Sequence, residues 1–482
     1  MAWETVIGLE VHVQLRTRTK MFCADRTTFG DPPNTNVCPV CLGLPGALPV
    51  PNAEAIRLGT RAALALGCTV HQTSVFARKN YFYPDLPKGY QISQFDKPLA
   101  TGGSVRFDST ERGRLRVGIT RLHLEEDAGK LLHDRFPGKT AVDLNRAGIP
   151  LAEIVSEPDL RSPAEARAYL ATLRQILVYA GVSDCSMEQG SLRVDANISI
   201  RRPGDTRLGT KTEVKNMNSF ANVERALEAE RARQITLLES GQRVEQVTLL
   251  FNAGSGQVKP IRSKEESHDY RYFPDPDLPP LVLLPAWIDE QRAALPELPE
   301  AKRARLETEY VLPAYDAGVI TSEPELARFF ESVVRAGADP KTAANWIMGE
   351  VMTTYNERGA FPVSPERLAR LIALVRGGGL SHQAAKRVYA ELALTPTEDP
   401  AAVAERLGLT QVSDESALTG WVDEVLAAHP GEVSRFRNGE SKLMAFFVGQ
   451  VMKRSKGKAD PKGVQPLLQQ RLRQTAESES SR

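Results

Sequence analysis

The sequence is poor in cysteine, has almost no net charge and contains no long apolar run. Its 482 residues include five cysteines, too few and too unevenly spaced for a disulfide framework in a chain of this size. The first residues, MAWETVIGLE, lack a basic segment followed by an apolar stretch, so no secretory signal is predicted. The longest charge-free run, from Pro32 to Ala53, is broken by Pro, Gly and Asn, which excludes a membrane-spanning helix there. We therefore expect a cytoplasmic protein with reduced thiols and no membrane contact.

The usual motifs for nucleotide binding and acyl transfer are also missing. The sequence has no GxxxxGK[ST] loop and no GxGxxG, so a bound nucleotide requires another architecture. No GxSxG is present, and the sequence suggests no cysteine–histidine pair, so nucleophilic acyl chemistry is not predicted. P-loop kinases are thereby excluded, whereas phosphate binding by Lys79, Lys88 and metal ions remains open.

The character of the sequence changes twice along the chain. Up to about Leu284, short β-patterned runs alternate with Gly/Pro turns, and the stretch from about Trp287 to Leu409 is helical and rich in Ala, Leu, Arg and Glu. From Gly431 to Arg482, eleven Lys or Arg stand against five Asp or Glu, so a basic tail follows an acidic body. We predict an α+β fold with a mainly antiparallel sheet domain with helices at residues 1–290, an all-α domain at 291–409 and a small helical tail domain at 410–482.

The sequence predicts four particular helices, the best defined of which has signals at both ends. The segment from Ser162 to Ala180 begins with an N-cap serine, a proline at the first helical position and a capping-box glutamate, and its leucines recur on one face. The other three are predicted at about Ser219 to Gly241, at Ser441 to Lys453, and from Asp460 onward.

Several predicted strands carry polar residues on one face only. Successive residues of a strand point to opposite sides, so residues two apart share a face. In the segment from Glu4 to Leu15 one side is almost wholly apolar, and the other side carries Gly8, Glu10, His12 and Gln14. In the segment from Ser191 to Ile200 the apolar side opposes Ser191, Arg193, Asp195, Asn197 and Ser199. Two shorter sets that share a face are Lys211, Glu213 and Lys215, and Leu151, Glu153, Val155 and Glu157.

Two interpretations fit these polar faces. A solvated face is common in antiparallel sheets, but it usually carries Lys, Glu, Thr and Ser. Here His, Gln, Asn, Arg and single carboxylates dominate, and carboxylates with one imidazole suit Mg²⁺ or Mn²⁺ beside phosphate oxygens. Between Leu115 and Glu126 the alternation slips near Arg121, which indicates a bulge and leaves open whether Glu125 or Glu126 joins the polar side.

The cysteines suggest a second metal site. Cys38 and Cys41 stand on a tight turn, and Cys23 precedes them at a spacing compatible with structural zinc. Asp25 or water would complete a tetrahedral set of ligands. Plain buried thiols are the alternative, and a redox pair is disfavoured because LGLPGALPVP follows Cys41 instead of a helix start.

A series of longer strings resembles one known family. These strings are, in order, IGLEVHVQL, NTNVCPVCLGLPG, KNYFYPDLPKGYQISQ, LHLEEDAGK, DLNRAGIPLAEIVSEPD, MEQGSLRVDANISI, TEVKNMNSF and SKEESHDYRYFPDPDLPP. Together they closely resemble the B subunits of bacterial aspartyl/glutamyl-tRNA(Asn/Gln) amidotransferases, and FFVGQVMKRSKGKADP resembles the C-terminal tail of that family. The resemblance covers the chain from end to end.

This resemblance implies one subunit of a three-subunit ligase with glutamine as amido donor. An amidase-type A subunit would release ammonia from glutamine, and a small C subunit would brace the pair. The B subunit would bind misacylated Glu-tRNA(Gln) or Asp-tRNA(Asn), phosphorylate its side-chain carboxylate with ATP and Mg²⁺, and let ammonia displace the phosphate. The family fold is a "cradle" sheet domain, a helical domain and a tail.

The resemblance also implies roles for individual residues. Glu10, His12 and Glu125 would bind Mg²⁺, with Glu126 and Glu153 as further contributors, and Lys79 and Lys88 would bind phosphate. Arg193, Asp195 and Asn197 would orient the aminoacyl end or water, and Lys215 and Asn216 would line the same cavity. The basic cluster of Lys453, Arg454, Lys456, Lys458 and Lys462 would contact tRNA phosphates. The family often has a cysteine where this chain has Asp25, so a zinc site in this chain would have three cysteines and not four.

Two rival functions remain open from the sequence. The chain would be a catalytically silent tRNA-binding scaffold if its polar strand faces held only structural waters and ions. It would be a stand-alone zinc-dependent RNA-binding protein if the cysteine cluster were its main functional feature.

Overall fold

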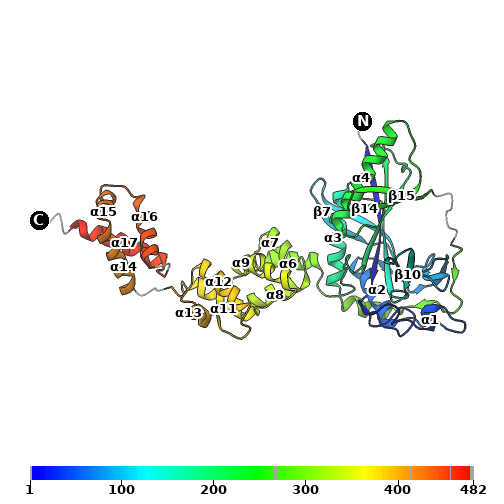
Figure 1. Cartoon of the computed structure of the whole chain (residues 1–482), viewed down its shortest axis with the longest axis horizontal. Coiled ribbons are helices and arrows are strands. Elements are labelled where there is room, and N and C mark those ends of the chain that lie inside the picture. Colours follow the sequence, from blue (N-terminus) through cyan, green and yellow to red (C-terminus); the bar gives the residue numbers. More distant parts are fainter. Residues whose placement is uncertain (1–2, 264–269, 412–414, 456–457, 478–482) are drawn as a thin grey trace. The chain divides into compact units, whose positions relative to one another are not determined.

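The computed structural model describes residues 3–263, 270–411, 415–455 and 458–477 and divides into two compact units, Met1–Ala301 and Lys302–Arg482. All strands of the described residues fall in the first unit, and the second unit is helical (Figure 1). This composition confirms the predicted α+β class. Within the described ranges no helix has both the length and the apolar character needed to cross a bilayer.

The strands are β1 (Glu4–Gln14), β2 (Thr69–Val70), β3 (Thr73–Ser74), β4 (Phe76–Asn80), β5 (Tyr90–Gln94), β6 (Ala100–Thr101), β7 (Ser104–Ser109), β8 (Gly113–Glu126), β9 (Lys130–Phe136), β10 (Lys139–Asp143), β11 (Pro150–Ser156), β12 (Leu192–Arg201), β13 (Thr212–Lys215), β14 (Val247–Asn252), β15 (Gln257–Ser263), β16 (Phe273–Pro274) and β17 (Leu281–Val282). The helices of the first unit are α1 (Pro39–Leu42), α2 (Ala53–Ala65), α3 (Pro163–Tyr179), α4 (Phe220–Glu239) and α5 (Pro285–Ala293). The later helices are α6 (Pro299–Glu309), α7 (Ala314–Ile320), α8 (Pro324–Arg335), α9 (Pro340–Trp346), η1 (Ile347–Val351), α10 (Met352–Arg358), α11 (Pro365–Arg376), α12 (His382–Leu392), α13 (Pro400–Arg406), α14 (Glu415–Ala428), α15 (Pro430–Arg437), α16 (Leu443–Arg454) and α17 (Pro461–Glu477).

A ten-stranded sheet forms the body of the first unit. Its strand order is β15-β14-β13-β12-β1-β11-β8-β6-β2, with β7 also paired to β8, and the pairs are antiparallel except β13 with β14. The long strand β1 therefore lies between β12 and β11 near the middle of the sheet. Its apolar residues Leu9, Val11 and Val13 are almost fully buried, and Glu10 and His12 point to the opposite face, as the alternation in the sequence predicts.

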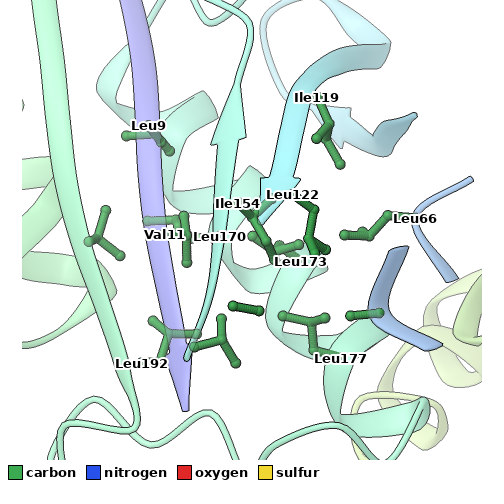
Figure 2. Packing of buried hydrophobic residues seen from close by; sticks show 14 of the residues in the cluster. Leu9, Val11, Leu66, Ile119, Leu122, Ile154, Leu170, Leu173, Leu177 and Leu192 are labelled. Carbon is green, nitrogen blue, oxygen red and sulfur yellow. The ribbon is translucent and has the colours of Figure 1, made fainter. Parts of the chain in front are cut away.

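Helices α3 and α4 cover the apolar face of the sheet. Leu170, Leu173 and Leu177 of α3 belong to the same buried cluster as Leu9 and Val11 of β1 (Figure 2). Each such side chain contributes about 1.5–3 kcal/mol when it is fully removed from water. Since this face is closed by helices, the polar face of the same strands is the side that remains for a functional site.

Helix α3 begins where its sequence predicts. The Ser162 hydroxyl accepts a hydrogen bond from the backbone of Glu165, and the Glu165 carboxylate accepts one from the backbone of Arg161. Burial raises the pKa of Glu165, but an ion pair with Arg112 lowers it below its ordinary value, so this carboxylate is ionised. The cap therefore both starts the helix and anchors it to the hairpin of β7 and β8.

Strand β8 contains the bulge that its sequence indicates. In its pairing with β11, Arg121 lies opposite Val155 and Ile119 lies opposite Ser156, so Thr120 has no counterpart. The extra residue exchanges the two faces of the strand. Val117 and Ile119 are buried on one side of it, and Leu122 and Leu124 continue the apolar face on the other side. His123 and Glu125 consequently join the polar face.

A small three-stranded sheet, in the order β16-β4-β5, lies against β8. The Gln91 side chain of β5 donates to the backbone oxygen of Glu126 at 2.6 Å. Asn80 of β4 holds the following segment, because its backbone donates to the oxygen of Tyr270 and its side chain to the oxygen of Arg271, at 2.9 and 2.8 Å. This small sheet therefore forms a second side of the space beside β8.

The described residues form three separate hydrophobic clusters. The first spans residues 7–288, the second spans 306–404, and the third spans 418–472. Their limits coincide with the predicted division at about residues 290 and 410, although the contacts group the last two clusters in one unit. The three-domain division stays a prediction. The four helices predicted from caps and stripes correspond to α3, α4, α16 and α17.

Candidate active site

The candidate site is a row of side chains across four neighbouring strands. The register pairs His12 of β1 with Arg193 of β12 on one side and with Glu153 of β11 on the other. Glu153 in turn pairs with His123 of β8. Because directly opposite residues in a sheet point to the same face, these four side chains meet on the polar face.

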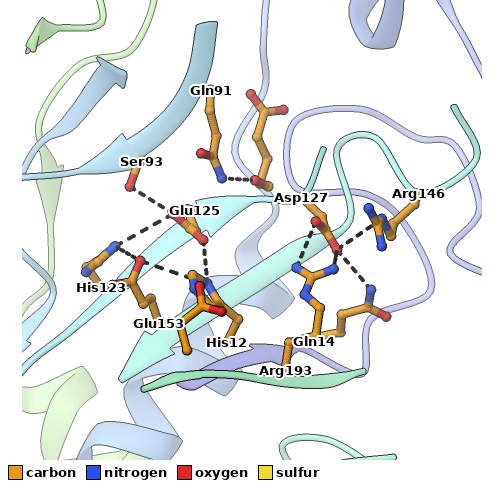
Figure 3. A network of polar contacts seen from close by, with 12 residues as sticks. His12, Gln14, Gln91, Ser93, His123, Glu125, Asp127, Arg146, Glu153 and Arg193 are labelled. Carbon is orange, nitrogen blue, oxygen red and sulfur yellow. Dashed lines mark hydrogen bonds and ion pairs between the residues drawn. The ribbon is translucent and has the colours of Figure 1, made fainter. Parts of the chain in front are cut away.

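Two carboxylates and two imidazoles form a buried cluster within this row (Figure 3). His12 Nδ1 lies 3.1 Å from Glu125 Oε1 and 3.9 Å from Glu153 Oε2. His123 Nε2 lies 3.2 Å from Glu153 Oε2 and 3.7 Å from Glu125 Oε2. One ligand atom from each of His12, Glu125 and Glu153 lies within 4.8 Å of the others, so these three residues form a group that could hold a metal ion.

Charge in this cluster is balanced between the carboxylates and the imidazoles. Burial raises the pKa of Glu125, but hydrogen bonds from His12 and His123 bring it well below its ordinary value. Burial lowers the pKa of His123, but Glu153 and Glu125 raise it to about 9. The carboxylates are therefore ionised, and the neighbouring imidazoles favour their protonated forms.

Glu125 and Glu126 point to different surroundings. Glu126 forms a close ion pair with Lys88 and accepts a hydrogen bond from the backbone of Ile92 at 2.9 Å. Glu125 instead faces His12 and His123. The bulge thus places Glu125 in the group with His12, and it places Glu126 beside a lysine that the sequence predicts to bind phosphate.

Lys79 approaches the cluster from the small sheet. Burial lowers its pKa, but Glu125 raises it above its ordinary value, so the ammonium group keeps its charge in a half-buried position. Its Nζ lies 4.7 Å from the ring centre of Tyr270. On the neighbouring strand, the Ser93 hydroxyl donates to Glu125 Oε2 at 3.2 Å. A half-buried cation therefore lies beside the carboxylates, and among the described residues it forms no direct ion pair with them.

Arg193 is held by Asp127, an acidic residue at the end of β8. Its two terminal nitrogens donate to the two carboxylate oxygens at 2.8 and 2.9 Å. Gln14 donates to the same carboxylate at 3.1 Å, and Arg146 lies 3.7 Å from it (Figure 3). Arg193 is thus fixed in position by a bidentate ion pair, which Gln14 and Arg146 support.

Further polar residues adjoin Glu10 on β1, β12 and β13. Asn197 donates to Glu10 Oε1 at 3.1 Å, and Lys215 forms ion pairs with Asp195 and, at 3.2 Å, with Glu213. Burial and the neighbouring carboxylates raise the pKa of Glu10. Glu10 therefore lies next to the three-residue group of His12, Glu125 and Glu153 but is not one of its members.

The remaining predicted residues are Asn216 and the basic cluster of the tail. Asn216 adopts a left-handed backbone conformation (φ 68°), and its amide donates to the backbone oxygen of Phe251 at 3.1 Å. In the basic tail, Lys453 and Lys458 are exposed, and Arg454 pairs with Glu424. Lys456 lies outside the described residues, and the side chain of Lys462 is likewise not described.

The three predicted cysteines and Asp25 come together beside the sheet. The Cys41 sulfur lies 3.7 Å from that of Cys23, 3.9 Å from that of Cys38 and 3.1 Å from Asp25 Oδ2. Four sulfur or oxygen ligands around zinc at about 2.3 Å would place neighbouring sulfurs about 3.8 Å apart. The spacing of the cluster is compatible with a tetrahedral metal site, and the three cysteines with Asp25 form a group that could hold a metal ion.

A buried lysine supports this cysteine cluster. Lys20 is fully buried, and its ammonium group donates to the Cys41 sulfur at 3.3 Å and to the backbone oxygen of Asn36 at 2.7 Å. Hydrogen bonding by Cys23 lowers the pKa of Cys41 to about 6, against the effect of burial, and Lys20 contributes in the same direction. Cys41 therefore readily forms the thiolate that metal binding requires.

Sequence reasoning missed four residues of the site. His123 shares a face with Glu125 two positions later, but the phase slip in β8 hid this alternation. Asp127 is the last residue of the acidic run that begins at Glu125, and this run is the sequence feature from which Asp127 could have been predicted. Ser93 and Lys20 carried no signal in the sequence, because only the tertiary contacts bring them to Glu125 and Cys41.

Comparison with known proteins matches both parts of the chain. A family model described as the GatB/GatE catalytic domain matches residues 5–289, and one described as the GatB domain matches residues 328–472. The first match contains every candidate residue of the sheet face and the cysteine cluster. The second match contains most of the helical second unit, including the basic cluster of the tail.

Full-length relatives agree with these domain matches. The B subunit of the aspartyl/glutamyl-tRNA(Asn/Gln) amidotransferase of Moorella thermoacetica is 54% identical over 478 residues, which cover 98% of this chain and 100% of the relative. The B subunits of the same enzyme from Geobacter sulfurreducens and Chlorobium phaeobacteroides are 52% and 51% identical, again over 98% of this chain and 100% of the relative. These matches confirm the resemblance noted in the sequence. The chain therefore belongs to the family of aspartyl/glutamyl-tRNA(Asn/Gln) amidotransferase B subunits.

Proposed function

We propose that this chain uses ATP to phosphorylate the side-chain carboxylate of glutamate or aspartate on a misacylated tRNA, and that ammonia then displaces the phosphate. One observation carries the proposal: the group of half-buried His12 with buried Glu125 and Glu153 lies on the sheet face next to the half-buried cation of Lys79. Metal ligands and a cation on one face are the arrangement that phosphoryl transfer needs. The overall reaction is that of a carbon–nitrogen ligase with glutamine as amido donor.

The chemistry explains why phosphorylation precedes amidation. A carboxylate is a poor electrophile, because attack by ammonia would require oxide to leave. In the first step a carboxylate oxygen bonds to the γ-phosphorus of ATP, and the bond to the β-phosphate oxygen breaks to release ADP. In the second step ammonia bonds to the acyl carbon, the carbon–oxygen bond to phosphate breaks, and nitrogen loses a proton. The substrate carboxylate is already ionised, so the first step requires no dedicated base.

The sheet-face residues fit a divalent cation. His12, Glu125 and Glu153 supply one nitrogen and carboxylate oxygens, a donor set that suits Mg²⁺ or Mn²⁺. His123 adds a second imidazole beside this group, and its buried Nδ1 has no hydrogen-bond partner among the described residues. When bound, Mg²⁺ would neutralise charge on the phosphate oxygens. Glu10 and Glu126 would contribute from the edges of this group.

The other polar residues would position the substrates. Lys79 and Lys88 would bind phosphate oxygens, and Glu126 would hold Lys88 in place through its ion pair. Arg193, fixed by Asp127, would orient the aminoacyl end of the tRNA. Asp195, Asn197, Lys215 and Asn216 would line the adjoining part of the cavity.

The reaction requires partners. An amidase-type A subunit would supply ammonia from glutamine, and a small C subunit would brace the two larger subunits. The substrate would be Glu-tRNA(Gln) or Asp-tRNA(Asn), and the basic tail with Lys453 and Lys458 would contact tRNA phosphates. We place the reaction in the cytoplasm, because misacylated tRNA has to be corrected before it takes part in protein synthesis.

We propose that the cysteine cluster binds structural zinc. The helical turn that carries Cys38 and Cys41 ends at Gly43, where φ is 64° and a Cβ would lie 2.7 Å from Lys88 Cγ. Zinc bound by Cys23, Cys38, Cys41 and Asp25 would hold this turn against Lys88. The metal would thus support a phosphate-binding residue without contact with the substrate.

The first prediction tests the phosphorylation step. In the purified three-subunit complex, His12→Ala and Glu125→Ala should each lower tRNA-dependent ADP formation on the order of 100-fold, because each removes a ligand from the metal group. Glutaminase activity should persist, and His133→Ala, which changes an exposed histidine, should leave ADP formation unchanged. Undiminished ADP formation in both variants would show that His12 and Glu125 were wrongly assigned to the metal site.

A second prediction separates the two adjacent glutamates. Binding of Mn²⁺ to the complex, followed by electron paramagnetic resonance, should weaken at least about 10-fold in Glu125→Gln, because a ligand oxygen is lost. Glu126→Gln should have a smaller effect, since Glu126 pairs with Lys88. The reverse order of the two effects would show that Glu126 is the ligand.

A third prediction concerns zinc. Elemental analysis should find about one zinc per chain, and Cys41→Ala should lose the metal and lower the melting temperature, because the metal stabilises the folded state. Cys68→Ala is the matched control, since Cys68 is a buried thiol outside the cluster. Absence of zinc from the wild-type complex would refute this assignment.

A fourth prediction concerns the tail. The variant with Lys453→Ala and Lys458→Ala should bind tRNA more weakly, and the slope of log affinity against log salt should fall by about 1.5 to 2, since each phosphate contact releases about one counterion. The distribution of tRNA between free and bound forms across a salt series measures this slope. An unchanged slope would mean that these lysines do not contact phosphates.

A further inference from the structure

An aromatic stack stands beside the candidate site and has no role in the proposed mechanism. Phe95 follows β5, and Tyr272 precedes β16, so the two residues come from separate edges of the small sheet. Their rings are parallel within 7°, and the ring centres lie 4.2 Å apart. Phe95 is 56% exposed, so Tyr272 covers one face of its ring and the other face remains open.

The stack borders the buried cluster. Ser93 of β5 donates to Glu125, and Phe95 lies two residues farther along the chain, directly after the end of that strand. Phe273 pairs with Arg78, which brings Tyr272 next to Lys79. Burial raises the pKa of the Tyr272 hydroxyl, Lys79 lowers it, and Glu125 and Glu153 raise it, which places this hydroxyl within electrostatic reach of all three.

Local stability does not require this stack. Asn80 already holds the backbone at Tyr270 and Arg271 through its hydrogen bonds, and Arg78 donates to Asp275 at 2.9 Å. A phenylalanine that is more than half exposed gains little from burial in the folded chain. An exposed ring face beside a phosphate-handling site is instead the kind of platform on which a nucleobase stacks.

We propose that the stack of Phe95 and Tyr272 is the platform for the adenine base of ATP. This proposal rests on the proposed function, which requires ATP at the cluster. The sequence has no glycine-rich loop to hold a nucleotide, so a mononucleotide needs its affinity from cations and from a base contact nearby. A tRNA has a much larger surface for binding, and it depends less on one stacked base. The open face of Phe95 would take the base, and Lys79 would meet the phosphates.

Steady-state kinetics of the complete three-subunit complex tests the proposal. Phe95→Ala should raise the KM for ATP about 5- to 30-fold, which is the loss expected for one stacked base. The kcat and the KM for misacylated tRNA should change less than about 2-fold. Phe95→Trp should retain the KM for ATP, because it keeps a large aromatic face. Phe136→Ala is the control, since Phe136 is 52% exposed on β9 and lies in another hairpin.

Two results would overturn the proposal. An unchanged KM for ATP in Phe95→Ala would show that the base binds elsewhere. A rise in the KM for misacylated tRNA alone would show that the stack binds the tRNA end instead of ATP. The melting temperature of Phe95→Ala should equal that of the wild type, because the ring is exposed. Either result then reflects a change in binding and not a loss of the fold.

Titration of the complex with ADP and Mg²⁺ separates this proposal from the proposed function. Calorimetry should show ADP binding to the wild type and to Phe136→Ala, and binding weakened about 5-fold or more in Phe95→Ala. If the wild-type complex formed no ADP from ATP with misacylated tRNA, the proposed function would fail, and this titration would still report on the platform. Equal ADP affinity in wild type and Phe95→Ala would reject the platform by itself.

Discussion

The two-sided character of β1 is the constraint on which the rest of the first unit depends. A strand places alternate residues on opposite faces, so the same eleven residues supply both the centre of the hydrophobic core and the centre of the polar cluster. Helices α3 and α4 close the apolar face, and this closure fixes which way His12 and Glu10 point. Burial of Leu9 and Val11 therefore determines the position of His12 as firmly as its own contacts do.

The polar cluster depends on pairing between strands more than on any single strand. His12, Glu153, His123 and Arg193 lie far apart in the sequence, and antiparallel register places them in one row. Their charges offset one another, which allows ionised carboxylates to remain in a buried place. The adjacent small sheet then adds Lys79 and Ser93 from the open side. A site of this kind needs both sheets to be formed.

Periodicity and local caps predicted much of this fold, and the resemblance predicted the family. The faces of β1 and β12, the start of α3 and the cysteine cluster all follow from residues near one another in sequence. The roles of His123, Ser93 and Lys20 could not be predicted in the same way, because they arise from contacts between distant segments. Asp127 is an intermediate case, since its acidic neighbours were visible but its ion pair with Arg193 was not. The roles assigned to the site residues stay predictions.

The bulge at Thr120 has a consequence for the length of β8. On its N-terminal side odd-numbered residues such as Val117 and Ile119 face the core, and on its C-terminal side even-numbered residues such as Leu122 and Leu124 do. A regular strand of the same length, without the unpaired residue, would turn these two leucines toward the polar cluster. Loss of Thr120 would instead restore a regular strand with both leucines still facing the core. In a segment of this length the unpaired residue is thus what brings His123 and Glu125 to the polar face while both halves of the strand keep their apolar side chains in the core.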